Sequence, residues 1–257
     1  PVERYLILSA ISESVRLFEA APSLIDAGQK KLLQSGIPTG LNEISSADRK
    51  KDQMLQPKTS DLSKKIQNFD QEKGKCDTGR LMQEVYLHSF RTPDYQGHGE
   101  HFLEAFHYDF IPEYHYRIGR MTLTKRVCLC YGKNQVAVVY RVKNQPDRRA
   151  VIRLTPLVNY RNYHYLSSHR DMAFTTQLNG STMEIVSYDK NRKIYLDCSD
   201  GSPVLMDSCY FYNMDYPYEH ERGLNGTEDH FIPGYYEIEI LPGEEKTITF
   251  VCSAGEK

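Results

Sequence analysis

The sequence contains no tryptophan, almost no net charge and no long run of apolar residues. Its 32 basic and 34 acidic side chains give a formal charge of -2 at pH 7, so the basic surface of a nucleic-acid-binding protein is not expected. No stretch approaches the ~20 apolar residues of a membrane-spanning helix, and the first residues do not lead into a signal-peptide core. The sequence therefore predicts a soluble, cytoplasmic protein that binds neither nucleic acid nor membrane.

Several sequence motifs that carry chemistry are also absent. Neither GxGxxG nor GxxxxGK[ST] occurs, which argues against a Rossmann-type or P-loop enzyme, and no serine lies in GxSxG. The six cysteines include no CxxC pair, so zinc and thioredoxin-like chemistry are not indicated, and we expect reduced, buried thiols. The sequence gives no reason to expect a cofactor.

The aromatic residues and histidines are very unevenly distributed along the chain. Eighteen of the 19 tyrosines, eight of the 10 phenylalanines and all nine histidines lie after residue 83. Residues 13–83 instead carry polar and charged clusters, with a helix-like spacing of Leu17, Leu24 and Ile25 near their start. We therefore predict three parts: a first strand at 1–12, a helical or disordered insertion or linker at 13–83, and a β-domain at 84–257.

The third part alternates between apolar and polar residues, as half-buried strands do. Clear examples are Met121-Leu123, Ile152-Leu154, Ile194-Leu196, Tyr236-Ile238-Ile240 and Ile248-Phe250. Turn signals separate these segments, and Asn179-Gly180 is the best two-residue hairpin candidate, because both residue types accept positive φ. About ten to twelve short strands without βαβ alternation predict an all-β fold, a large antiparallel β-sandwich.

Three segments have polar residues at a density that packing alone does not require. In the first, His98, Glu100 and His101 are close enough in sequence to bind a metal, but a further protein ligand at a fixed spacing is missing. Loop histidines with a purely structural role are the favoured interpretation. We expect no metal site.

The second segment, residues 156–165, follows an apolar strand. Its side chains Tyr160, Arg161, Tyr163 and His164 would project from one end of the sandwich, where aromatic rings can stack on sugar faces and planar donors can bind hydroxyls. A structural corner packed by tyrosines explains the same residues equally well.

The third segment, residues 210–234, is rich in carboxylates and includes Glu221, Arg222 and Asp229. Paired carboxylates can act as acid and base in glycoside hydrolysis when the fold sets their separation. Ion pairing of Arg222 with Glu219 or Asp229 is at least as good an explanation, so no catalytic residue is assigned. We group Glu221, Arg222 and Asp229 with the four residues of the second segment as candidate substrate-binding residues.

Four pieces of the sequence resemble one known family: PVERYLILS, FLEAFHYDFIPEYHYRIG, LTPLVNYRNYHYL and ERGLNGTEDHFIPGYYEIEILPGE. Together they make residues 1–12 and 84–252 similar to the N-terminal domain of bacterial and archaeal glycogen debranching enzymes, of the amylo-α-1,6-glucosidase type. The resemblance implies a mutarotase-like β-supersandwich that precedes an α/α-toroid glycosidase domain. That helical domain, which holds the family's catalytic carboxylates, is not contained in these 257 residues.

Three functions follow from this combination. The leading hypothesis is a non-catalytic sandwich that binds α-glucan, such as glycogen or limit dextrin, and packs on a helical catalytic domain of the same enzyme. The second is a free-standing glucan-binding module. The third is a mutarotase-like or lyase-like enzyme that uses a histidine and a glutamate inside the sandwich. Glucan affinity and catalytic turnover of this chain alone distinguish them.

Overall fold

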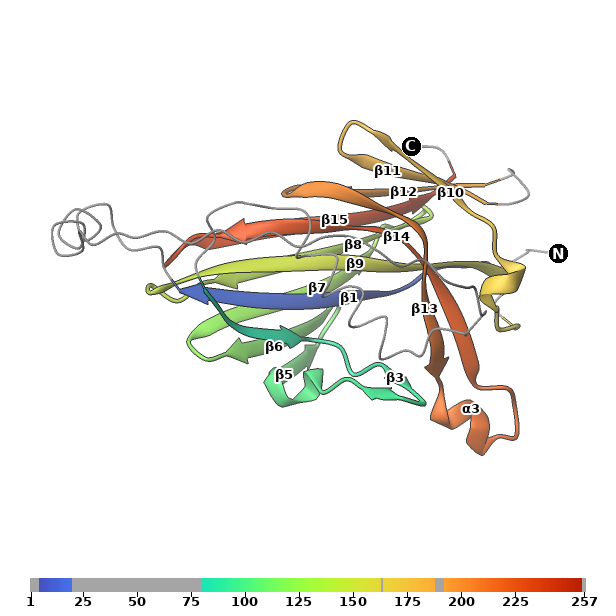
Figure 1. Ribbon diagram of the computed structural model, residues 1–257, viewed down its shortest axis with the longest axis horizontal. Helices are drawn as coiled ribbons and strands as arrows, with labels where there is room; N and C mark the ends of the chain where they lie inside the picture. Colours follow the sequence, from blue (N-terminus) through green and yellow to red (C-terminus); the bar gives the residue numbers. More distant parts are fainter. Residues whose placement is uncertain (1–4, 20–79, 163, 188–191, 256–257) are drawn as a thin grey trace, which may run out of the picture. The chain divides into compact units, whose positions relative to one another are not determined.

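The computed structural model describes residues 5–19, 80–162, 164–187 and 192–255, which are drawn in colour in Figure 1. Most of the predicted insertion, residues 20–79, lies outside the described residues. Among the described residues, no helix is long and apolar enough to cross a membrane.

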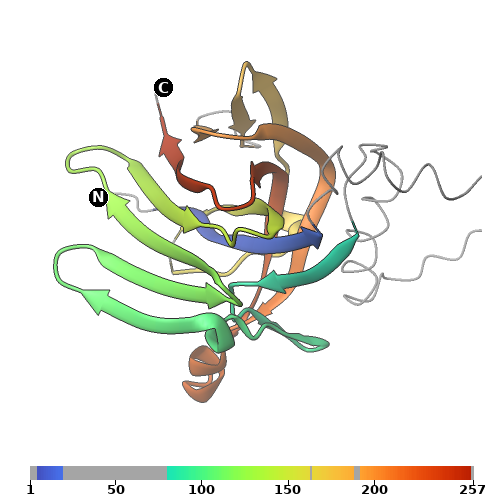
Figure 2. The ribbon, with the colours of Figure 1, turned by 90° about the vertical axis from the view of Figure 1, so that its left-hand side faces the viewer.

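Two antiparallel sheets form the described part of the chain (Figures 1 and 2). The smaller has five strands in the spatial order β13 (Ser202–Asp215), β14 (Thr227–Ile240), β9 (Arg148–Asn162), β1 (Tyr5–Glu19) and β2 (Leu81–Tyr86). The larger has eight strands in the order β10 (Thr175–Asn179), β11 (Thr182–Val186), β12 (Lys193–Cys198), β15 (Glu245–Ala254), β8 (Gln135–Lys143), β7 (Met121–Leu129), β6 (Pro112–Ile118) and β5 (Leu103–Tyr108). The predicted antiparallel β-sandwich is confirmed.

Only short elements lie outside the two sheets in the described residues. They are the ribbon of β3 (Arg91–Thr92) and β4 (Tyr95–Gln96), the 3-10 turns η1 (Gly99–Phe102) and η2 (His169–Asp171), and the helix α3 (Pro217–Glu221). In Figure 1, α3 lies beyond the ends of β13 and β14.

The period-two residues of both sheets meet in one buried cluster. Val15, Ile152 and Ile238 from the smaller sheet and Ile185 and Ile248 from the larger sheet belong to it, and all five are at most 1% exposed. Alternation places every second residue of a strand on the same face, which is how apolar residues from both sheets reach this cluster. Burial of this layer is the main favourable term for the sandwich.

Two buried tyrosines connect the sheets by hydrogen bonds in addition to packing. Tyr140 of β8 donates from its hydroxyl to Glu13 Oε1 of β1, at 2.9 Å. In the opposite direction, Tyr236 of β14 donates to the carbonyl oxygen of Leu196 in β12, at 2.7 Å. Buried hydroxyls need such partners, and here the partners fix how one sheet sits on the other.

The first strand is longer than the sequence indicated. We predicted a strand at 1–12 followed by a helical segment, but β1 continues to Glu19, so Leu17 lies in a strand. Val15 pairs with Ile152 of β9 on one side and with Val85 of β2 on the other. These cross-strand partners are over 60 residues away, and their packing outweighs the local helix-like spacing.

The predicted Asn179-Gly180 hairpin is present with its turn one residue later. Asn179 still pairs with Thr182, so the two loop residues are Gly180, at φ +66°, and Ser181. The turns at Gly119, Gly132 and Gly243 also have positive φ at the glycine, at +61°, +72° and +72°.

The buried hydroxyl of Tyr140 supplies a stability test. Tyr140→Phe removes one of the donors of the buried Glu13 carboxylate, so we expect the free energy of unfolding to fall by about 1.5–3 kcal/mol in urea titrations. Tyr131→Phe is the matched control, because Tyr131 is fully exposed in the β7–β8 turn and its loss should change stability by less than about 0.5 kcal/mol. Equal effects of the two substitutions would contradict the connecting role of Tyr140.

Candidate functional site

The second and third polar segments of the sequence meet at one end of the five-stranded sheet. Strands β9 and β14 are antiparallel neighbours, with Val158 opposite Phe231. The last residues of β9 therefore lie beside the first residues of β14. This arrangement brings Arg161 next to Glu228, from which it is separated by 67 residues in the sequence.

The carboxylate of Glu228 is the centre of the cluster, and its side chain is completely buried. Arg161 donates to both carboxylate oxygens, from Nε to Oε1 and from Nη2 to Oε2, the latter at 3.0 Å. Tyr216 donates its hydroxyl to Oε2 at 3.0 Å. A buried carboxylate is tolerated only when it is paired and hydrogen-bonded, and the fork of the guanidinium satisfies both requirements.

The same carboxylate holds the loop that follows β9. The backbone N–H of Ser167 donates to Glu228 Oε1 at 3.1 Å, and the side chain of Asn159 donates to the same oxygen at 3.0 Å. Asn159 in turn accepts from the Ser167 hydroxyl at 2.8 Å. One anion therefore binds β9, β14 and the loop after β9 together.

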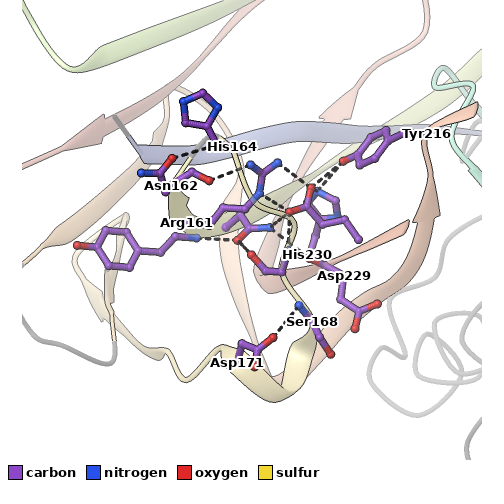
Figure 3. A network of polar contacts seen from close by, with 12 residues as sticks. Arg161, Asn162, His164, Ser168, Asp171, Tyr216, Asp229 and His230 are labelled. Atoms are coloured by element: carbon purple, nitrogen blue, oxygen red, sulfur yellow. Dashed lines mark hydrogen bonds and ion pairs between the residues drawn. The ribbon is translucent and has the colours of Figure 1, made fainter. Parts of the chain in front are cut away.

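His230 is fully buried. Its imidazole lies beside the hydroxyl end of Tyr216, as Figure 3 shows. Its Nε2 lies 3.4 Å from the Tyr216 hydroxyl and 3.6 Å from Glu228 Oε2, while Nδ1 has no hydrogen-bond partner among the described residues. Burial lowers the pKa of His230, so the imidazole is neutral at pH 7. Burial, and then the charge of Glu228, raises the pKa of the Tyr216 hydroxyl, which stays a donor.

The carboxylate of Asp229 holds further backbone groups beside Glu228. These two carboxylates and their hydrogen-bond partners are called the anchor below. Asp229 Oδ2 accepts from the backbone N–H of His169 at 2.9 Å and contacts His169 Nδ1 at 2.7 Å, and Asp229 Oδ1 accepts from the backbone N–H of Asn213 at 2.8 Å. Burial alone would raise the pKa of Asp229, but the His169 and Asn213 donors outweigh it and hold the pKa below its usual value. Asn213 has a φ of +55° and lies in an irregular stretch of β13. Such bulges redirect a backbone group, here an N–H towards a carboxylate.

Residues 216–226 form a loop that the cluster holds at its base. The backbone N–H of Tyr216 donates to the carbonyl oxygen of Gly226 at 2.7 Å, and His220 Nε2 lies 2.9 Å from Asp215 Oδ1. A Cβ on Gly226 would lie only 2.7 Å from the Tyr216 carbonyl oxygen, so the closed loop requires glycine there. The helix α3 lies at the outer side of this loop.

The candidate binding residues fall into an interior group and an exposed group. Arg161 and Asp229 are part of the buried cluster. Tyr160 is only 6% exposed, so its ring face is not open to a sugar, contrary to the expectation from the sequence. The reason is that β9 continues through Asn162, which places Tyr160 inside the sheet rather than at its end. Tyr163 lies outside the described residues.

The remaining candidates, His164, Glu221 and Arg222, are all exposed. Arg222 pairs with Glu219, at 3.4 Å, which is one of the two pairings considered from the sequence. Asp229 instead pairs with His169. The structure thus brings Arg161 and Asp229 to the same anchor and leaves Glu221 and Arg222 on the loop that the anchor holds.

Sequence reasoning missed most members of the anchor, above all Asn159, Ser167, His169, Tyr216 and Glu228. One signal was present, since Glu228, Asp229 and His230 are three consecutive ionisable residues at the start of the largely apolar strand β14. Chemically, the oxygens of Glu228 are occupied by internal donors. The arrangement positions two loops, and it does not resemble an acid–base pair facing a substrate.

A pocket of about 340 Å³ lies elsewhere, at the edge of the sandwich between the two sheets, and its lining includes Glu13, His88, Glu100 and Lys125. Glu13 forms an ion pair with Lys125. Burial, and then the charge of Lys125, lowers the pKa of His88 to about 4, so this histidine is neutral at pH 7. The first polar segment of the sequence, which carries His98 and His101, forms the turn η1 beside this pocket.

Asp229 gives a pH-dependent test of the anchor. Asp229→Asn removes a charged acceptor from two backbone donors, so we expect the free energy of unfolding at pH 7 to fall by about 1–3 kcal/mol. Because the pKa of Asp229 is lowered by folding, its stabilisation is present above the unfolded-state pKa and is lost as the pH falls through the folded-state pKa. The difference from wild type should therefore narrow below about pH 4 in denaturant titrations.

The control for this test is Asp207→Asn, because Asp207 is exposed on β13. It should change stability by less than about 0.5 kcal/mol at any pH. A constant difference between Asp229→Asn and wild type from pH 7 to pH 3 would contradict a charged Asp229 as anchor.

Three solved structures have low similarity to the chain. A protein described as a kojibiose phosphorylase, from the human microbiome, is 10% identical over 56% of this chain and 17% of its own length, with a TM-score of 0.30. The Slr1438 protein from Synechocystis sp. PCC 6803 is 10% identical over 60% of this chain and 65% of its own, with a TM-score of 0.35. A polysaccharide lyase is 14% identical over 56% of this chain and 21% of its own, with a TM-score of 0.32. The chain thus spans less than two thirds of each of these proteins.

Comparison with protein families is more informative. No curated protein matches the chain. The family model described as glycogen debranching enzyme N terminal matches residues 78–247, which is 170 of the 257 residues. The matched region contains Arg161, Glu228 and Asp229, so the anchor lies inside it. The chain belongs to the glycogen debranching enzyme N-terminal family.

Proposed function

We propose that this chain is the β-sandwich part of a cytoplasmic glycogen debranching system. It binds α-glucan and packs on a separate α/α-toroid domain that hydrolyses α-1,6 branch points. The observation that carries the proposal is the family match over residues 78–247. In this proposal the hydrolysis is an inverting reaction with two catalytic carboxylates, and both belong to the helical domain. The sandwich binds the glucan and positions it for that domain.

The anchor explains how a sandwich could present a glucan-binding surface. Glu228 binds Ser167 in the loop after β9 and Tyr216 at the base of residues 216–226, so both loops start from the same buried carboxylate. Each loop exposes a tyrosine: Tyr165 is 70% and Tyr218 is 75% exposed. Exposed aromatic rings held by a rigid base suit the apolar faces of sugar rings, and ordering them costs little at binding.

The seven candidate residues take two roles in this proposal. His164, Glu221 and Arg222, with Tyr163, contact sugar hydroxyls or the helical domain. Tyr160, Arg161 and Asp229 act from the interior and keep the loops in place. Substitutions in the second group should lower the melting temperature together with glucan affinity, whereas substitutions in the first group should lower affinity alone.

The test measures two properties of the full 257-residue chain, its binding to glycogen and its release of glucose. We expect retardation in glycogen-containing gels, and no glucose release from glycogen, limit dextrin or small α-1,6 glucosides. Tyr165→Ala and Tyr218→Ala should each weaken retardation by roughly 2- to 12-fold, which corresponds to about 0.5–1.5 kcal/mol per stacked ring, with unchanged melting temperature. Tyr131→Ala, from the exposed β7–β8 turn, is the control and should bind as wild type does.

Two results would contradict the proposal. Retardation that is insensitive to both Tyr165→Ala and Tyr218→Ala would remove the loops from glucan recognition. Glucose release by the chain alone, abolished by Glu221→Gln or Asp229→Asn, would make the end of the sandwich an active site.

The pocket between the sheets supports a second candidate, a mutarotase-like sugar enzyme. It brings a glutamate, Glu13, and a histidine, His88, to one cavity lining, as that hypothesis requires. However, Glu13 is already bound by Lys125 and Tyr140, and His88 Nδ1 accepts from the backbone N–H of Phe90 at 3.3 Å. Accelerated mutarotation of glucose by the chain, lost in His88→Ala, would favour this candidate over the first.

A further inference from the structure

Three metal-ligand side chains converge on the loop that connects β4 to β5. His98 Nδ1 lies 3.1 Å from Glu100 Oε1, and His101 Nε2 lies 3.9 Å from the same oxygen. All three ligand atoms lie within 4.8 Å of one another. In the part of the chain that the structure describes, no other three His, Cys, Asp or Glu side chains converge in this way. The sequence led us to expect no metal site, and this geometry calls for a different interpretation.

The convergence results from a tight backbone turn rather than from a chance meeting of long side chains. The backbone N–H of His101 donates to the carbonyl oxygen of His98 at 3.1 Å, which closes the 3-10 turn η1. Residues three apart in such a turn lie on the same side. The two imidazole rings accordingly stack, with centroids 5.1 Å apart and planes 6° from parallel.

Two glycines allow this turn to pack closely against the residues that follow β2. A Cβ on Gly97 would lie 2.6 Å from the carbonyl oxygen of His88, and a Cβ on Gly99 would lie 2.3 Å from that of Leu87. The backbone N–H of Gly99 donates to the His88 carbonyl oxygen at 3.1 Å. The three ligand residues are therefore mounted on a backbone that is held in place before any ligand binds, which lowers the cost of binding.

Glu100 is oriented by a neighbour that does not belong to the three ligands. The hydroxyl of Ser89 donates to Glu100 Oε2, which leaves Oε1 directed towards the imidazoles of His98 and His101. Carboxylates that bind metals are commonly held by such hydrogen bonds, and loss of the donor typically weakens metal binding. A plain surface ion pair between histidine and glutamate does not require this support.

We propose that His98, Glu100 and His101 form a binding site for a divalent first-row transition ion, with Zn²⁺ as the expected occupant. Two imidazoles and one carboxylate are a known zinc ligand set, and bonds of about 2.0–2.1 Å place tetrahedral ligands about 3.3 Å apart. The measured separations of 3.1 and 3.9 Å are close to that value, and the exposed imidazoles can turn to close the difference. Imidazole ligands disfavour Mg²⁺ and Ca²⁺, which prefer oxygen.

Three protein ligands leave at least one coordination position open. Ser89 and Glu100 also line the pocket between the sheets, so the ion would sit at the pocket rim. Water, or an oxygen atom of a small polar molecule in the pocket, can fill the open position. The site lies on η1 and on the segment that follows β2, apart from the Glu228 anchor, so it stands independently of the glucan-binding proposal.

The experiment measures Zn²⁺ binding to the full chain, without an affinity tag and after removal of metals by EDTA, by isothermal titration calorimetry. We expect one ion per chain. His98→Ala, His101→Ala and Glu100→Gln should each abolish the binding, and Ser89→Ala should weaken it about tenfold. Co²⁺ should give the visible absorption of a tetrahedral site in wild type and lose it in the same three ligand variants.

Two controls separate this site from other sources of Zn²⁺ affinity. His107→Ala removes an exposed histidine of the neighbouring strand β5, and Cys128→Ser with Cys130→Ser removes the closest pair of thiols in the sequence; both proteins should bind as wild type does. All variants should have the wild-type melting temperature without metal, because the ligands are exposed. Absence of Zn²⁺ binding, or binding that survives loss of His98 and His101, overturns the proposal.

Discussion

One buried ion pair, between Glu228 and Arg161, determines the shape of the end of the sandwich that carries the family's motifs. A carboxylate with no exposed surface would be prohibitively costly without partners, because desolvation disfavours the charged form. Here the cost is offset by donors from three separate places: the end of β9, the loop that follows it and the residue that precedes α3. The charge of Glu228 is therefore fully hydrogen-bonded only when all three segments are folded.

The rest of the described structure can be understood as support for this end. The period-two strands bury one apolar layer between the sheets, and the hydroxyls of Tyr140 and Tyr236 cross that layer in opposite directions. The sheets so fixed bring β9 and β14 side by side, and only this pairing puts Arg161 within reach of Glu228. The strands position the anchor, and the anchor positions the two loops whose exposed residues contact a glucan or a helical domain in the proposed function.

The fold followed from the sequence because alternation of apolar residues is a local signal. The extent of β1 did not, because Val15 and Leu17 are selected by partners in β2 and β9 that lie far along the chain. The same limit applies to the site. Tyr160 was expected to face a sugar, but the strand continues past it and buries its ring, whereas Glu228 gained its role only through a pairing invisible in sequence. The convergence of His98, Glu100 and His101 did not follow from the sequence either, because the glycines that bring these side chains together act through close packing against Leu87 and His88, just after β2.

The most direct test of the central claim is a double-mutant cycle on the buried pair, with Arg161→Met, Glu228→Gln and the double variant compared in urea titrations. If the pair is the anchor, each single substitution leaves a buried partner unsatisfied and lowers the free energy of unfolding by about 3–5 kcal/mol. The double variant should then lose clearly less than the sum of the two, with a coupling energy of about 1–3 kcal/mol. Losses that add to within about 0.5 kcal/mol would show that Arg161 and Glu228 act independently, and would contradict the account.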